Sequence, residues 1–211
     1  MRSEYKTVPA LFKHLKDVLS SQRFLRMEGL NNDIPFFLCP FSVKDKRNVE
    51  QMIPQLKKHL MDNGIAVLEL NLYDLCIKLL KEAEIFDQLC EIEKDTEKGF
   101  FLESLQSILD VESHIVPAIE DSISEHAQTD ILFLTGVGEV FPYIRTHNIL
   151  NNLQSSVKKF PLVLFFPGEY TQSLDKGTTL SLFGILPGDK YYRAYDLTKY
   201  EIQGAADAKI E

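Results

Sequence analysis

The chain has 211 residues, 45% of them hydrophobic, and a formal net charge of −8 at neutral pH. A chain of this length and composition can bury one substantial core, which excludes global disorder and favours a single domain. The negative charge repels nucleic acid at long range, so we expect no direct binding to nucleic acid.

Three isolated cysteines, without a pair at the C-x-x-C spacing, argue against a disulfide framework or a zinc site and indicate a reducing compartment. They are Cys39, Cys76 and Cys90. Residues 1–19 carry charges throughout, which a secretory signal peptide would not. No stretch approaches the roughly 20 apolar residues that span a bilayer. We therefore expect a cytoplasmic protein that does not enter a membrane.

The first elements along the chain are a helix, a strand and a second helix. Val8–Ser21 has apolar residues at helical spacing. Ile34–Cys39 is a short apolar run between Asn, Asp and Pro residues, which is typical of a buried strand. Asp45–Asn63 predicts a helix that is kinked or restarted at Pro54.

A second strand and a long helical region follow. Ile65–Leu70 predicts the strand, and Asn71 can cap one helix over residues 72–93. Two further helical patterns, Phe100–Leu109 and His114–His126, precede the next strand. These helices exceed a simple crossover, so we expect a helical insertion over about residues 72–127.

Three more strands are predicted towards the end of the chain. They are Ile131–Leu134, Leu162–Phe166 and Tyr191–Asp196. Between the last two, a region rich in Gly, Thr and Ser predicts an ordered loop around a short helix at Thr179–Phe183. Residues 204–211 predict a flexible tail.

Strands that alternate with helices predict a three-layer α/β fold, Rossmann-like or P-loop-like. We expect a mostly parallel sheet of about five strands with helices on both faces, in one domain over residues 1–203. In such a sheet, ligands and partners gather beyond the carboxyl ends of the strands.

The predicted strand ends contain no complete catalytic motif. A P-loop enzyme has a glycine-rich phosphate loop after its first strand and acidic metal ligands after a later one. Here residues 40–46 contain no glycine, and Thr135-Gly136 follow the third strand. Gly136 and Gly138 lack the third glycine of a dinucleotide motif, because Phe141 occupies its position. We therefore expect a tight turn, no enzyme, no cofactor and no metal ion.

A helix with Pro142 in its first turn is expected after this turn, and it carries two polar stripes. One stripe has Arg145, Asn148 and Asn152, and the other has His147, Asn151 and Gln154. The stripes fit either a recognition surface or a buried polar network that fixes the sheet geometry. A lone helical histidine without a neighbouring acid or nucleophile favours a structural role for His147.

Two glutamates and two tyrosines also lie near the predicted strand ends. Glu139 and Glu169 each follow a glycine, so they fit a pair of catalytic or metal-binding carboxylates, or caps of their loops. Tyr143 and Tyr170 have the polar tips of interface anchors, and equally of residues at a sheet end.

Long blocks of the sequence resemble the BrxB family, core proteins of bacteriophage exclusion (BREX) defence systems. The blocks include FLTGVGEVFPYIRTHNILNNLQ, LVLFFPGEYTQSLDKGTTLSLFG and DKYYRAY, and the resemblance runs from about Phe24 to Tyr200. It implies a bacterial or archaeal protein encoded with an alkaline-phosphatase-like PglZ protein, a DNA methyltransferase and a large ATPase. It implies no established catalytic activity for this component.

The leading hypothesis is a non-enzymatic assembly or regulatory subunit of a BREX complex, with the PglZ-type protein as the favoured partner. The methyltransferase and the ATPase are further candidate partners, and a homodimer stays open. The alternative is an enzyme with an unrecognised hydrolase or nucleotide site around Glu139 and Glu169. A DNA-binding module would need a basic face that includes Lys158 and Lys159, which conflicts with the acidic balance.

Overall fold

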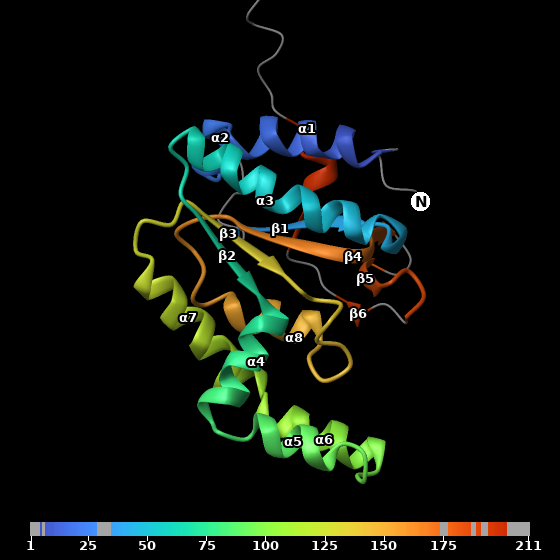
Figure 1. The fold of residues 1–211 in the computed structure, drawn as a ribbon. Helices are drawn as coiled ribbons and strands as arrows, with labels where there is room; N and C mark the ends of the chain where they lie inside the picture. The colour runs from blue at the N-terminus through green and yellow to red at the C-terminus, as the bar shows by residue number, and fades with distance from the viewer. Residues whose placement is uncertain are drawn as a thin grey trace, which may run out of the picture.

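A parallel sheet with the strand order β2-β3-β4-β1-β7 lies at the centre of the fold (Figure 1). The computed structural model describes residues 5, 7–28, 35–173, 177–186, 189–190 and 194–201. The parallel strands are β1 (Phe36–Phe41), β2 (Val67–Asn71), β3 (Ile131–Thr135), β4 (Leu162–Ser173) and β7 (Tyr195–Asp196). Helices cover both faces, so the α/β fold and its mostly parallel sheet are confirmed.

The central strands are continuous apolar runs because both faces of the sheet are covered. Every residue of β1 and of β3 is buried. β4 lies between these two strands, with Leu162 opposite Phe36 on one side and opposite Leu132 on the other. The carboxyl ends of β1 to β4 consequently meet at one edge of the sheet.

One face of the sheet packs against α1 (Val8–Leu19) and α3 (Lys46–Asp62), with the short α2 (Gln22–Leu25) beside them. Phe133 and Phe165 project from β3 and β4 into this layer, and their ring centroids lie 5.2 Å apart. A single-turn 3₁₀ helix, Val43–Asp45, leads from β1 into α3. α3 includes Pro54 and does not restart there.

The opposite face packs against α4 (Leu72–Glu82), α7 (Val116–Glu125) and α8 (Thr146–Leu153). The single helix predicted over residues 72–93 is wrong, because Glu84 has a left-handed φ of 58° and the chain restarts as α5 (Phe86–Ile92). α5 and α6 (Lys98–Ile108) lie beyond this layer, on the side away from the sheet (Figure 1). A short π-helix, Val111–Ile115, then leads into α7.

The carboxyl half of β4 leaves the parallel sheet and pairs with an antiparallel strand. Gly168–Ser173 pairs with β5 (Gly177–Leu182), which in turn pairs with β6 (Asp189–Lys190). The short helix predicted at Thr179–Phe183 is therefore wrong. Leu180 and Leu182 are buried while Thr179 and Ser181 are half-exposed, and this alternation is that of a strand.

The last predicted strand, Tyr191–Asp196, is present as β7 at Tyr195–Asp196, and residues 191–193 lie outside the described residues. The predicted tail at 204–211 also lies outside them. Among the helices that the structure describes, none is both long and apolar enough to cross a membrane. A last 3₁₀ turn, Leu197–Lys199, follows β7.

Candidate functional site

A cavity of about 400 Å³ lies where the carboxyl ends of β1, β2 and β3 and the end of the parallel part of β4 face the start of α3. We call it the strand-end cavity. Its polar lining consists of Lys46, Glu50, Glu69, Asn71, Tyr73, Thr135 and Glu139. A volume of this size falls within the usual range of small-molecule sites, and the position is the one at which open α/β sheets gather ligands.

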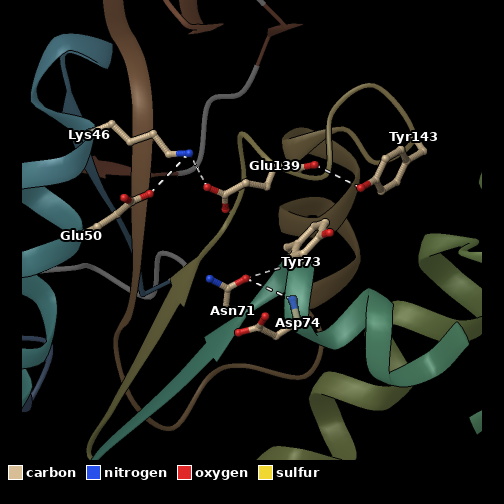
Figure 2. Close-up of polar contacts among 7 residues, drawn as sticks. All are labelled: Lys46, Glu50, Asn71, Tyr73, Asp74, Glu139 and Tyr143. Atoms are coloured by element: carbon tan, nitrogen blue, oxygen red, sulfur yellow. Dashed lines mark hydrogen bonds and ion pairs between the residues drawn. The ribbon is translucent and has the colours of Figure 1, made fainter. Parts of the chain in front are cut away.

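Lys46 forms ion pairs with two carboxylates of the strand-end cavity (Figure 2). Its Nζ atom lies 2.5 Å from Glu139 Oε1 and 3.4 Å from Glu50 Oε1. The hydrogen bond to Glu139 raises the pKa of Lys46, and the charge of Glu50 adds to the effect. Lys46 therefore stays protonated well above neutral pH, and the cavity contains a fixed positive charge beside two carboxylates.

The turn after β3 positions Glu139. Gly136 has a left-handed φ of 76°, and a Cβ atom there would collide with the Asn71 amide oxygen. Only glycine fits such a position without strain. The same Asn71 oxygen accepts hydrogen bonds from the backbone N–H groups of Tyr73 and Asp74 at 2.9 and 3.2 Å (Figure 2). The predicted cap of α4 by Asn71 is confirmed.

Thr135, the last residue of β3, lines the strand-end cavity, and its hydroxyl is buried. Its side chain is on the α3 side of the sheet, because it alternates in phase with Phe133. The residue is 6% exposed. Within the described part of the chain, its Oγ1 atom has no hydrogen-bond partner. Buried polar atoms without partners are rare and mark positions that a ligand can satisfy.

The two glutamates predicted as a pair occupy different environments. Glu139 lines the strand-end cavity. Glu169 is exposed on the antiparallel part of β4, opposite Ser181, and is not among the residues that line the cavity. The structure does not bring the two carboxylates together in this cavity. Within the described residues, no group of three or more His, Cys, Asp or Glu residues could hold a metal ion.

Tyr143 and Tyr170 both hydrogen-bond to backbone. The half-buried Tyr143 donates its hydroxyl to the carbonyl of Glu139 at 3.1 Å, which ties the end of the loop to its start (Figure 2). Burial raises the pKa of Tyr143 to about 12, so this hydroxyl remains a donor at neutral pH. Tyr170 is buried and donates to the carbonyl of Ala194 at 2.7 Å, just before β7.

The helix that carries the polar stripes begins later than predicted. Residues 137–144 form turns, Arg145 has extended backbone at the N-cap, and α8 begins at Thr146. The placement of Pro142 in the first helical turn is therefore wrong. Val140 and Ile144 lie in these turns and are buried, although they are not helical.

The polar stripes lie mainly on the outer side of α8, because its buried residues face the sheet. Those buried residues are Thr146, Ile149, Leu150 and Leu153. Arg145, Asn148 and Asn151 are exposed, whereas His147, Asn152 and Gln154 are half-buried. The Asn152 amide donates to the Asn148 carbonyl at 2.9 Å, and the Gln154 amide donates to Asn151 Oδ1 at 3.2 Å. The Arg145 guanidinium lies 5.6 Å from the Phe141 ring centroid.

Sequence reasoning missed Lys46, Glu50, Glu69 and Thr135 as cavity residues. Lys46 begins α3, one 3₁₀ turn after the exit of β1, and in sequence its charge also fits a solvated helix face. Its position at that exit was the available signal, because strand exits of a parallel sheet converge.

Comparisons with known proteins identify the family. A profile described as "BREX protein BrxB" matches residues 68–197. A Bacillus cereus (strain H3081.97) protein named BREX protein BrxB is 34% identical over 183 residues, which cover 85% of this chain and 91% of that protein. An Escherichia coli O9:H4 (strain HS) protein of the same name is 28% identical over 180 residues, 85% of this chain and 86% of that protein. No solved structure matches significantly. The chain therefore belongs to the BrxB family of BREX proteins.

Proposed function

We propose that this protein is a non-enzymatic assembly or regulatory subunit of a BREX phage-defence system in the cytoplasm. It binds other BREX proteins, and the PglZ-type protein is the favoured partner, with the methyltransferase and the large ATPase as further candidates. Membership of the BrxB family supports the BREX assignment. The binding role is supported by the outer surface of α8.

That surface, formed by Arg145, Asn148 and Asn151, is the observation that carries the proposal. Charged residues are depleted at the centres of protein interfaces, whereas arginine is enriched there. Amide side chains can exchange water for a partner's hydrogen bonds at a lower desolvation cost than ionised groups. This set of one arginine and two exposed asparagines is therefore better suited to a protein interface than the charged residues of an ordinary solvated helix face are.

The chemistry of the strand-end cavity supports a role other than nucleotide hydrolysis. Three glutamates and one lysine line it, so its charge repels phosphate groups. Lys46, the cation that could contact a phosphate, is engaged by Glu139 and Glu50. Glu169 does not line the cavity, so the alternative hydrolase site lacks its second carboxylate there.

Co-purification from cells that express the neighbouring BREX genes tests the proposal. The tagged protein is expected to retain the PglZ-type protein at moderate salt. Replacement of Arg145, Asn148 and Asn151 together by Ala is expected to weaken that capture by at least about 2 kcal/mol, because interface arginines often contribute that much. The melting temperature is expected to stay nearly unchanged, because exposed substitutions alter stability by only about 0.5 kcal/mol.

A matched control lies on the opposite layer of the molecule. Gln51, Gln55 and Lys58 are exposed on α3 and combine two amides with one cation, like the α8 set. Gln55 also donates to the Gln51 carbonyl, at 3.1 Å, as Asn152 does to Asn148. Their replacement by Ala is expected to leave capture unchanged. Wild-type protein that retains no BREX component, or forms only a homodimer, would contradict the proposal.

A further inference from the structure

The strand-end cavity combines two kinds of lining. Phe41 and Phe165 contribute aromatic side chains, while Glu50, Glu69 and Glu139 contribute carboxylates. An occupant that matches both needs an apolar stem and a polar head. Basic side chains have this construction, because their aliphatic stems pack on apolar surface while the head remains charged.

The net negative charge of the lining indicates that the polar head of the occupant is a cation. Three glutamates oppose one lysine among the lining residues. Lys57 lies 3.6 Å from Glu69 from outside the lining, and counting it still leaves one carboxylate in excess. A concave site with this balance attracts a cation and repels an anion.

Thr135 is a separate observation that points to the same occupant. The residue lines the cavity, and its buried hydroxyl lacks a hydrogen-bond partner among the described residues. A hydroxyl oxygen can accept a hydrogen bond from a guanidinium N–H group. An inserted cation would therefore satisfy both the excess carboxylate and this oxygen.

We propose that the strand-end cavity binds an arginine side chain that a protein partner presents. This inference rests on the proposed function, because the arginine would come from a partner protein. Arginine fits better than lysine because its planar guanidinium pairs with carboxylates through two parallel hydrogen bonds and stacks on aromatic rings. In the free protein, Lys46 occupies part of the carboxylate set, and the incoming guanidinium competes with it for Glu139.

A titration followed by amide NMR tests the cavity without any partner. The probe is N-acetyl-arginine-N-methylamide, and the matched control is the citrulline analogue, which has nearly the same shape without the charge. Saturable shifts at the amides of residues 135–139 are expected with the arginine compound alone. Equal shifts with both compounds, or none with either, would overturn the proposal. If spermidine binds more tightly than the arginine compound, the occupant is a free polyamine and the arginine proposal is wrong.

Substitutions assign the binding to named groups. Glu139→Gln is expected to lower the affinity for the arginine compound by about tenfold, because one charge-assisted hydrogen bond is lost. Thr135→Val should also weaken it, whereas Lys46→Met should strengthen it by removing the competing cation. Glu82→Gln is the control, because Glu82 also pairs with a lysine, Lys78 at 3.7 Å, but does not line the cavity. Unchanged affinity in Glu139→Gln and Thr135→Val would refute the assignment.

Capture of BREX proteins separates the two proposals. If wild-type protein retains a partner and Thr135→Val and Glu139→Gln reduce that retention, the arginine proposal is supported. If these variants retain the partner as well as wild type does, the arginine proposal fails and the proposed function stands. If wild-type protein retains no partner, the proposed function fails, and the source named for the arginine fails with it.

Discussion

Lys46 at the start of α3 and Glu139 in the turn after β3 lie 2.5 Å apart, although they are distant in sequence. Both residues line the strand-end cavity, and their pair joins α3 to the turn after β3. Both side chains remain partly exposed, at 41% and 31%, so the pair is screened by solvent. It organises charge in the cavity more than it stabilises the fold.

The alkaline limb of the stability curve is expected to report this pair. The pKa of Lys46 is raised, so the pair contributes stability below the ordinary lysine pKa and loses it as pH rises through the raised value. Lys46→Met should therefore show a shallower loss of stability than wild type in that window. Denaturant unfolding at a series of alkaline pH values measures it. A parallel loss in both proteins would show that the pair is not formed.

Phe133→Ala is expected to cost roughly 3–5 kcal/mol, because the side chain is fully buried and packs edge-on against Phe165. Phe100→Ala, at a residue that is 66% exposed on α6, should change stability by no more than about 0.5 kcal/mol. Urea unfolding of the two variants provides the comparison. Similar losses for both would contradict the position of Phe133 in the core.

Two buried hydroxyls, removed one at a time, are expected to have different effects on the free energy of unfolding. Tyr170→Phe leaves the Ala194 carbonyl without this donor and should cost about 1–3 kcal/mol. Thr135→Val removes a hydroxyl that has no partner among the described residues, so stability should stay constant or rise. Thermal melts of the free protein distinguish these outcomes. A large loss in Thr135→Val would mean that its hydroxyl is satisfied within the fold.

The strands that could be predicted from sequence are those whose apolar pattern is visible within a short stretch of the chain. β1 and β3 are covered on both faces, so they are continuous apolar runs that stand out from their surroundings. β5 could not be predicted in this way. Thr179 and Leu180 are strand residues because they pair with the extended half of β4, and that pairing is not visible in a local window.

The strand-end cavity was predictable in position but not in composition. Convergence of parallel strands indicates where a site lies, and Glu139 was identified on that basis. Lys46 and Glu50 begin a helix whose charges also fit a solvated face, and Thr135 has no motif around it. Their roles depend on how α3 packs over the sheet, which is a tertiary property.

Gly136 and Asn71 are expected to act as one unit. Gly136→Ala places a Cβ against the Asn71 side chain, which caps α4, so it should cost the left-handed strain plus about 0.5–2 kcal/mol for the disturbed cap. Gly64→Ala is the control, because Gly64 has a similar φ of 77° but an added Cβ there would meet no atom within 4 Å. The excess cost of Gly136→Ala over Gly64→Ala should largely disappear when Asn71 is already Ala, since the cap is then absent. Denaturant unfolding of the single and double variants measures this coupling, and full additivity would show that the turn and the cap are independent.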